Sequence, residues 1–424
     1  MVIMKKLLTA ITAVAAVLAI SSCNKEKEAT TVSTVSVSVQ LPEDFPAEAV
    51  FEGKVTANNK TTGESIEAQA SAGVAEFKKV PFGVYDFSAS WSLSGEEFAA
   101  IAPGLASVSV SINGVASEIV LSKDQIDGAE VEIKTVWSVA APLIFSRIYN
   151  FGTLNLAGKA FNIDKYLEIF NNSDEVQYLD GLYIGEAWGD AITVSMFDGI
   201  ASSDSLYMRR ISKFPGSGNE YPVQPGKSVV VAMNAKNHID AEVVVNTVDL
   251  SGAEFECYVD GAASFFPADN AEVPNLVPDI YQASSFQAKF FVSQGFIPVL
   301  FKSSESEIAS YDRVIDPSMA SFPQYAGYAL KVPAKNVIDA VDLMRTGFES
   351  RGGKHVPTAV DAGFAMINQC SVAARKIART VGGRIYLSDT NNSTNDFVEL
   401  TSEAADGKHL VPKDYSDARI QPAE

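Results

Sequence analysis

Apolar and small polar residues alternate with a period of two along the first part of the chain, and this pattern is the strongest constraint on its fold. The segment TVSTVSVSVQL at residues 31–41 alternates throughout, and SVSVSI at 107–112 and EVEIKTV at 130–136 repeat the pattern. Successive side chains of a strand point to opposite faces, so these segments are typical of antiparallel strands with one buried face. Turn sequences such as TTGES at 61–65 separate them. Short strands broken by turns at this spacing predict an immunoglobulin-like β-sandwich at residues 31–135.

The N-terminal segment, residues 1–22, has the order of a secretory signal. Lys5 and Lys6 precede an apolar run that ends at Ile20, and two serines then lead to Cys23. A basic start, an apolar stretch of about 7–15 residues and small residues before the cut describe such a signal. The run is too short to be a spanning helix, which needs about 20 residues. We therefore exclude residues 1–22 from the fold.

The end of this segment, Ile20-Ser21-Ser22-Cys23, resembles the lipobox of bacterial lipoproteins. In that motif the signal is cut before the cysteine, whose sulfur carries a diacylglycerol. The resemblance implies that Cys23 is lipidated, that residues 23–30 form a tether, and that the protein is anchored to the outer membrane. The alternative is a plain secretory signal with an incidental cysteine.

The residues after Cys23, Asn-Lys-Glu-Lys-Glu, resemble the export tag of Bacteroidota lipoproteins that are displayed on the cell surface. A solvated linker is the other interpretation, and a tether of this composition cannot bury enough apolar area to fold. Both interpretations place the globular part of the chain at the end of a flexible anchor.

The charge of the chain limits its partners. Its 424 residues include 33 Lys and Arg against 52 Asp and Glu, a net charge of -19, and the signal removes two of the lysines. Nucleic acids and anionic lipid surfaces are bound through Lys and Arg that neutralise phosphates. Such a chain is expected not to bind nucleic acid, and its acidic surface favours solubility.

The two other cysteines, Cys257 and Cys370, leave two possibilities open. An exported protein is in a setting that permits disulfides, so they could pair. Both lie among apolar neighbours, where a buried free thiol is the commoner outcome. The sequence contains no Cys-x-x-Cys or Cys/His spacing typical of a metal site.

The second part of the chain begins after SVAAPLIF at 138–145. Its best-marked stretch, KYLEIFNNSDEVQYLDGLYIGE at 165–186, predicts a strand, a turn rich in Asn and Asp, and a second strand. It resembles the lamin-tail-like immunoglobulin fold, as do FPGSGNEYPVQPGKSVVVAMNA at 214–235 and a closing hairpin at 382–400. About 145 residues separate these last two markers, more than such a domain normally carries. We therefore expect residues 138–424 to form a larger, elaborated lamin-tail-like β-sandwich with long insertions, which makes the whole chain all-β.

The first part of the chain carries a resemblance of its own. Residues 51–91 resemble the prealbumin-like or carboxypeptidase-regulatory-like modules of surface proteins, with Gly73 and Gly83 at turns and Phe77 and Tyr85 entering the core. That resemblance implies a spacer or binding module without chemistry.

Taken together, the markers resemble a Bacteroidota outer-membrane lipoprotein family of unknown function. They include NHIDAEVVVNTVDLSGAEFE at 237–256, KVPAKNVIDAVDL at 331–343 and YLSDTNNSTNDF at 386–397. Members of that family are often encoded beside TonB-dependent receptors. The resemblance implies a surface lipoprotein that captures a ligand or assists a nutrient transporter.

Catalytic motifs are missing from the sequence. It contains no GxSxG, HExxH, Walker or GxGxxG pattern. The three histidines, His238, His355 and His409, are isolated in sequence, as ordinary core or surface histidines would be. Aromatic residues gather at 264–269 and 278–296, where they could bind a ligand or partner, or fill a core.

The strongest candidate for a bound ion is the segment from Asp389 to Asp396. Oxygen-bearing side chains recur along it in the series Asp389, Asn391, Ser393, Asn395 and Asp396. Calcium takes six to eight oxygen ligands, so this loop is a candidate calcium site. It lacks the glycine and closing glutamate of an EF-hand. The alternative is a hairpin whose side chains bond its own backbone, and the turn at 171–174 has the same two interpretations.

Three classes of function follow from these features. The first is a non-catalytic binding or accessory partner of a TonB-dependent nutrient transporter. The second is a structural or adhesive surface protein, and the third is a hydrolase built from scattered carboxylates. We expect the first, with no catalytic residues and no cofactor other than the candidate calcium ion.

Overall fold

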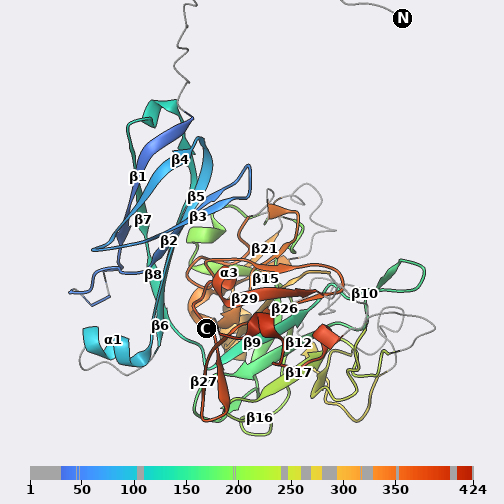
Figure 1. Ribbon diagram of the computed structural model, residues 1–424. Helices are drawn as coiled ribbons and strands as arrows, with labels where there is room; N and C mark the ends of the chain where they lie inside the picture. Colours follow the sequence, from blue (N-terminus) through green and yellow to red (C-terminus); the bar gives the residue numbers. More distant parts are fainter. Residues whose placement is uncertain are drawn as a thin grey trace, which may run out of the picture.

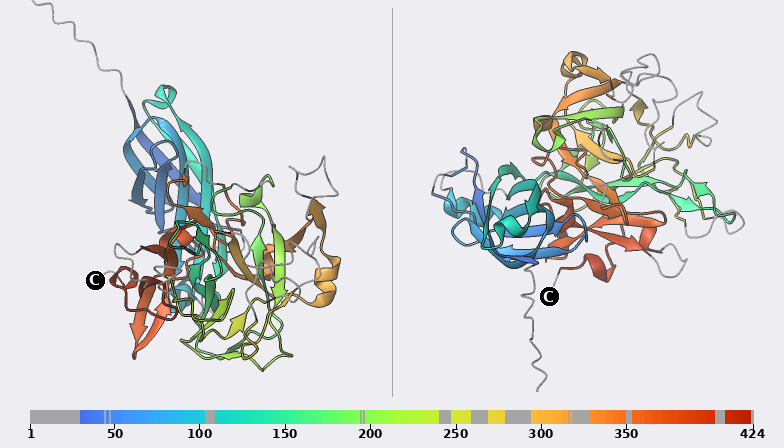
Figure 2. Two further views of the ribbon diagram at one scale, coloured as in Figure 1. Left: turned by 90° about the vertical axis from the view of Figure 1, so that its right-hand side faces the viewer. Right: turned by 90° about the horizontal axis from the view of Figure 1, so that it is seen from above.

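The computed structural model describes residues 30–43, 45–46, 48–102, 109–193, 195, 197–239, 247–258, 269–278, 294–315, 317, 328–349, 353–401 and 408–422. Strands dominate, and the expectation of an all-β protein is confirmed. The blue and cyan strands form an upright lobe at the upper left of Figure 1, beside a larger domain coloured green to red. Seen from above in Figure 2, the two domains lie side by side.

The first domain is a sandwich of two sheets. One sheet has the order β4 (Val74–Pro81), β1 (Thr31–Gln40), β7 (Ala129–Lys134). The other has the order β3 (Ser65–Gln69), β2 (Lys54–Asn59), β5 (Gly83–Leu93), β6 (Val110–Leu121), β8 (Val136–Val139). Because β8 pairs with β6, the first sandwich extends beyond the predicted boundary at residue 135.

The alternation in the sequence accounts for the core of this sandwich. Val35 and Val37 of β1 are fully buried, whereas the serines between and after them lie on the outer face. Phe77 and Tyr85 are buried in the same core, as predicted. Gly73 has a positive φ of 80° at its turn. Gly83 does not have a positive φ and begins strand β5, so its predicted role in a turn is wrong.

The second domain contains two larger sheets. One has the order β18 (Phe255–Glu256), β17 (Ser228–Ala232), β12 (Tyr166–Asn171), β9 (Leu143–Tyr149), β26 (Ser371–Arg375), β29 (Phe397–Thr401). The other has the order β21 (Arg313–Ile315), β22 (Tyr328–Pro333), β15 (Ser205–Lys213), β14 (Tyr183–Ala187), β20 (Ile297–Phe301), β23 (Val337–Ala340), with β19 (Val277–Pro278) beside β15. Their facing side chains form the main core, with Leu167 and Ile169 on one side and Leu206 and Met208 on the other.

Short pairs and helices complete the domain. The strand pairs are β10 (Thr153–Leu154) with β11 (Ala160–Phe161), β13 (Gln177–Tyr178) with β16 (Pro222–Val223), β24 (Leu343–Arg345) with β25 (Ala365–Ile367), and β27 (Ile377–Val381) with β28 (Arg384–Leu387). The helices are α1 (Gly95–Ile101) in the first domain and α2 (Glu305–Ser310) and α3 (Ser393–Asp396) in the second. No helix in the described ranges is long and apolar enough to cross a membrane.

The C-terminal segment covers the outer face of the β12–β9–β26 sheet. Leu410 and Ile420 are fully buried there in a second core, beside Tyr166 of β12. The Tyr166 hydroxyl donates to the Leu410 carbonyl at 2.5 Å, and the Lys413 amide donates to a Glu168 carboxylate oxygen at 2.7 Å. This cover buries β12 on both faces.

The predicted closing hairpin at 382–400 is also different. Strand β28 pairs with β27, and β29 pairs with β26. The segment between β28 and β29 therefore crosses from one sheet to another.

Candidate functional site

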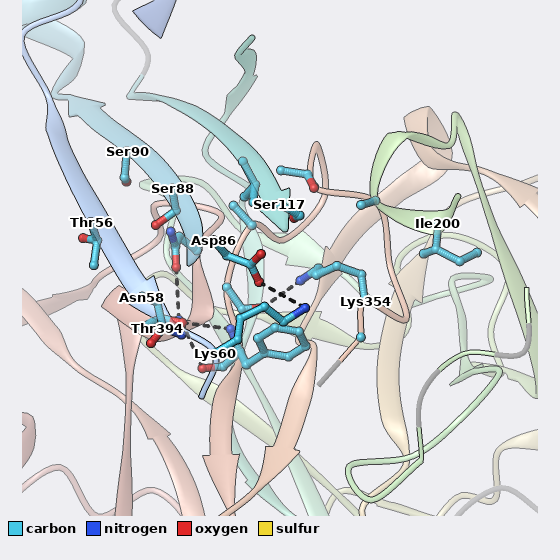
Figure 3. A pocket seen from close by; sticks show the side chains of 18 of the residues that line it. Thr56, Asn58, Lys60, Asp86, Ser88, Ser90, Ser117, Ile200, Lys354 and Thr394 are labelled. Carbon is cyan, nitrogen blue, oxygen red and sulfur yellow. Dashed lines mark hydrogen bonds and ion pairs between the residues drawn. The ribbon is translucent and has the colours of Figure 1, made fainter. Parts of the chain in front are cut away.

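A groove of about 830 Å³ lies between the two domains. One wall is the outer face of the β3–β2–β5–β6 sheet of the first sandwich. The opposite wall comes from three segments of the second domain, residues 195–201, 353–364 and 392–395. Figure 3 shows Thr56, Ser88 and Ser90 on the strands of the first wall, with Lys354 and Ile200 on the other side. A cavity of this size is in the range of small-molecule sites.

The first wall is formed by alternate residues of its strands. Thr56 and Asn58 of β2 and Ser88 and Ser90 of β5 line the groove, while the residues between them are buried in the sandwich core. Successive side chains of a strand take opposite faces, so the period-two pattern that builds the core also places a row of small polar groups outside.

Charged groups on this wall form ion pairs with one another. The Lys54 ammonium lies 3.0 Å from a Glu67 oxygen. The Lys60 ammonium lies 2.9 Å from a Glu118 oxygen and 3.9 Å from an Asp86 oxygen. The hydrogen bond to Glu118 raises the pKa of Lys60. The wall therefore presents paired charges and neutral hydroxyl and amide groups.

The opposite wall brings apolar groups to the groove. The Phe197 ring is stacked on Tyr207, with ring centroids 3.8 Å apart and an interplanar angle of 3°. Ile200 follows Phe197 along the same loop, and Phe364 comes from the segment before β25. The Lys354 ammonium lies 4.4 Å from the centroid of the Phe364 ring.

A buried ionic network supports this second wall. The Lys354 ammonium lies 3.1 Å from an Asp342 oxygen and donates to the Gly363 carbonyl at 2.7 Å. Asp342 also accepts hydrogen bonds from the His355 ring at 2.7 Å and from the His355 amide at 2.9 Å. The Asp342 side chain is fully buried. Burial alone would raise the pKa of Asp342, but the charges of Lys354 and His355 outweigh it and lower the pKa.

His355 bridges this network to the loop after β14. Its Nε2 lies 2.6 Å from the Thr193 carbonyl oxygen, and its Nδ1 faces Asp342. Burial opposes protonation of the ring, but the Asp342 carboxylate outweighs burial and raises the pKa of His355. With an acceptor at each ring nitrogen, the protonated imidazole satisfies both contacts. His355 is 4% exposed, so its role here is structural support.

A second buried carboxylate, Asp361, ties the network to the segment at 392–395. It accepts hydrogen bonds from the Ser393 amide at 2.8 Å, the Ser393 hydroxyl at 2.5 Å and the Asp342 amide at 2.8 Å. Gly363 is required for this approach, because a Cβ atom there would lie 2.1 Å from the Asn392 side-chain oxygen. The network thus sets the position of the second wall.

The candidate calcium loop, residues 389–396, lies at the junction of the two domains. The Asn391 amide nitrogen lies 2.8 Å from the hydroxyls of both Ser111 and Ser138 in the first sandwich. The Asn395 amide nitrogen lies 3.2 Å from the Ser90 hydroxyl. In the other direction, the Asn113 side chain donates to the Thr390 carbonyl at 2.7 Å. The asparagines of this loop therefore join the two domains at one edge of the groove.

The carboxylates of the same loop are directed inward to Arg375 of β26. One guanidinium nitrogen lies 3.2 Å from Asp389 and 3.4 Å from Asp396, and the other lies 3.0 Å from Asp339. Arg375 is 2% exposed. Burial lowers its pKa, but the three carboxylates outweigh burial and raise it. Burial raises the pKa of Asp339 to about 7, against the lowering effect of Arg375.

The side chains proposed as calcium ligands therefore diverge. Asp389 and Asp396 face Arg375, Asn391 and Asn395 face the first sandwich, and Ser393 faces Asp361. Within the described ranges no group of three or more His, Cys, Asp or Glu side chains is arranged to hold a metal ion. These contacts favour the alternative interpretation, a loop held by its own polar side chains and by Arg375.

We expect calcium to leave the stability of the protein unchanged. The Arg375 guanidinium already contacts both loop carboxylates, so a cation would have to displace it. Calcium at about 5 mM exceeds the dissociation constants of about 10⁻⁴–10⁻³ M of extracellular calcium modules. The melting midpoint should be the same with calcium, with magnesium at equal ionic strength, and with a chelator. A rise that calcium alone produces and the chelator reverses would establish the site.

Several other residues singled out in the sequence are placed by the structure. Cys257 is buried and Cys370 partly exposed, and they do not form a disulfide with each other. In the turn at 171–174, Asn171 accepts from the Ser173 amide at 3.0 Å and Asp174 pairs with Arg384 at 2.6 Å, as in a turn held by its own side chains. Cys23 lies outside the described residues, as do most of the aromatic clusters at 264–269 and 278–296.

The comparisons with known proteins agree with the predicted resemblance. Residues 224–404 match a family described as a protein of unknown function (DUF4876). No curated protein matches the chain. A crystal structure of a DUF4876 family protein from Bacteroides thetaiotaomicron matches with a TM-score of 0.52 and 23% identity, and covers 90% of this chain and 98% of that chain. The expected similarity to a Bacteroidota family of unknown function is confirmed: the chain is similar to DUF4876 proteins in sequence over residues 224–404 and in fold over most of its length.

Proposed function

We propose that this protein is a lipid-anchored binding protein of the outer cell surface, which holds a polar ligand in the groove between its domains. It acts without catalysis, beside an outer-membrane nutrient transporter of the TonB-dependent kind. The observation that carries the binding role is the groove itself, of about 830 Å³ and lined from both domains. The membrane anchor rests on the lipobox-like residues 20–23 and the transporter on the family resemblance.

The chemistry of the groove supports binding. Its lysines contact carboxylates at 2.9–3.1 Å, through Lys60, Lys54 and Lys354. A catalytic base or nucleophile needs a pKa matched to its task and a partner that activates it. Ion pairs at the rim and beneath the wall instead fix the shape of the groove, which is what a binding site requires.

Replacement of Cys23 by serine is expected to release the protein from the membrane. Several acyl chains, each contributing about 0.8 kcal/mol per buried methylene, hold a lipoprotein firmly on a bilayer. Without the sulfur they cannot be attached, so the variant should move almost completely to the soluble fraction. Replacement of Cys370, a free cysteine of the folded domain, by serine is the matched control and should leave the protein in the membrane.

Mild detergent extraction of the same membranes tests the transporter partnership. We expect wild-type protein and the Cys370→Ser control to be purified together with a β-barrel membrane protein, identified by mass spectrometry. Recovery of the wild-type lipoprotein alone, at detergent concentrations that keep other outer-membrane complexes intact, would rule out a stable partner. An unmodified Cys23 thiol in the intact protein would rule out the anchor.

A further inference from the structure

We infer that the ligand of the groove is an uncharged, hydroxyl-rich molecule, a neutral oligosaccharide or a segment of a neutral polysaccharide. The inference rests on the proposed function, because it names the ligand class of the same groove. It is drawn from the hydrogen-bonding groups, the charge balance and the apolar surface that line the groove.

The first wall offers hydroxyl groups that are free to bind a ligand. Among the contacts made by described residues, the hydroxyls of Thr56, Ser88 and Ser117 form no hydrogen bond. They stand on neighbouring strands β2, β5 and β6, all on the groove side. Strands of a sheet are spaced about 4.8 Å apart, and alternate residues along a strand about 6.7 Å apart. A hydroxyl both donates and accepts, so this array suits a ligand whose own hydroxyls do the same.

The charge balance of the groove disfavours an anionic ligand. Three lysines, Lys54, Lys60 and Lys354, face the groove together with four carboxylates, of Glu67, Asp86, Glu118 and Asp198. Each of the lysines already contacts a carboxylate, which for Lys354 is the buried Asp342. An anionic ligand would have to break one of these pairs and leave its carboxylate unmatched. A neutral ligand can accept from the lysines and donate to the carboxylates without separating them.

The second wall supplies an aromatic ring for the carbon side of a sugar ring. Phe364, which is partly exposed, lines the groove opposite the hydroxyl array, and the nearly buried Phe197 and Ile200 belong to the same wall. Sugar rings have polar edges and faces made of C–H groups, so they fit a site with hydroxyls on one side and aromatic or aliphatic carbon on the other. Sites for small molecules commonly combine an apolar lining with a few placed polar groups.

The backbone geometry of the first wall argues against an extended peptide as the ligand. Peptides that add to a sheet bind its unpaired edge through main-chain hydrogen bonds. The groove is formed by the face of the sheet, where β2 pairs with β3 and β5, and β5 pairs with β2 and β6. Their main-chain groups are engaged in the ladder, so recognition here depends on side chains.

The test uses full-length lipoprotein in detergent and a panel of soluble polymers. The neutral members are amylose, pullulan, galactomannan, mannan and xylan; polygalacturonate and heparin represent acidic glycans, and a tryptic digest of casein represents peptides. Binding is measured by calorimetry. We expect at least one neutral glycan to bind, with an affinity that changes less than about twofold between low and high salt, because no net charge is involved.

Two variants link that binding to the groove. Ser88→Trp fills the groove from the middle of the first wall and should abolish binding. Ser36→Trp is its matched control, since it makes the same change on the outer face of the other sheet of the same sandwich. The double variant Thr56→Val with Ser88→Ala removes two hydroxyls without filling space. It should weaken binding about tenfold, the expected loss for two neutral hydrogen bonds.

The outcomes separate this inference from the proposed function. Binding of peptides or acidic glycans that Ser88→Trp abolishes would overturn the neutral-sugar inference and leave a binding groove. No Ser88-dependent binding by any panel member would overturn the inference and remove the support for ligand capture. Co-purification with a barrel protein is measured separately and does not depend on the panel.

Discussion

Replacement of Arg375 by methionine is expected to lower the free energy of unfolding by about 3–5 kcal/mol at about pH 7.5, the range for removing one partner of a buried ion pair. The guanidinium is the counter-charge for Asp339, Asp389 and Asp396, which are all nearly or fully buried. It also donates to the Phe145 carbonyl at 2.8 Å. Methionine fills similar space but leaves the three carboxylates without a cation. Urea unfolding followed by tryptophan fluorescence measures the loss.

The pH dependence of the Arg375→Met variant identifies the cause. Burial already raises the pKa values of Asp339 and Asp396 above their ordinary range, and loss of Arg375 raises them further. A carboxyl with a raised pKa in the folded state binds more protons folded than unfolded, so acid stabilises the fold. The loss of unfolding free energy in the variant, relative to the wild type, should therefore become smaller as the pH falls from about 8 to 5.

Arg384→Met is the matched control for Arg375→Met. Arg384 pairs with Asp174, whose side chain is 78% exposed, and exposed pairs contribute about 0–1 kcal/mol. A deficit in Arg375→Met that is as small as in the control, or independent of pH, would mean that the carboxylates do not depend on Arg375.

The core of the first sandwich could be predicted from the sequence because strands such as β1 and β2 have one face in the core and one outside. Val35 and Val37 alternate with serines, so the period of the pattern is the period of burial. Strand β12 of the second domain was predicted as a strand, but its burial on both faces was not predicted. The C-terminal segment covers the face of Glu168 and donates to it through the Lys413 amide. Nothing local to β12 indicates that cover.

The candidate calcium loop shows why a site is harder to predict than a strand. Its oxygen-bearing residues are adjacent in sequence and were judged from their spacing. Their actual partners, Arg375, Asp361 and Ser111, come from distant segments of the same domain and from the other domain. A cation is indeed required near these carboxylates, but the chain supplies it as a guanidinium.

The groove was missed because the sequence of its first wall does not set it apart. Thr56, Ser88 and Ser90 are small and polar, but so are Ser36 and Ser38 on the outer face of β1, which is not part of the groove. The second wall leaves no local signal, because Phe197 and Lys354 lie far apart in the sequence and meet only in the fold.

The Asp342→Asn variant is expected to lose about 3 kcal/mol of stability near pH 6, because an isosteric amide leaves Lys354 and His355 without their carboxylate. Asp342 is fully buried and contacts both cations, at 3.1 and 2.7 Å. The same change should weaken ligand binding in the groove, since Lys354 and the segment after it form part of the second wall. Asp198→Asn is the control. This groove carboxylate is exposed, so the free energy of unfolding of the variant should equal that of the wild type within about 0.5 kcal/mol.

The pH dependence again distinguishes the ionic contribution from packing. The pKa of His355 is raised in the folded protein, so its contribution is complete below its unfolded pKa of about 6.5 and is lost as the pH rises through the folded value. The pKa of Asp342 is lowered, so its contribution persists to pH values below its ordinary range. In Asp342→Asn, the buried His355 ring has no carboxylate beside it, so burial should lower its pKa. Protonation of His355 would then destabilise the folded state, whereas in the wild type it stabilises it. The difference between wild type and variant should then be largest near pH 6 and decrease toward pH 9. A difference that stays constant across this interval would show that His355 does not carry charge in the network.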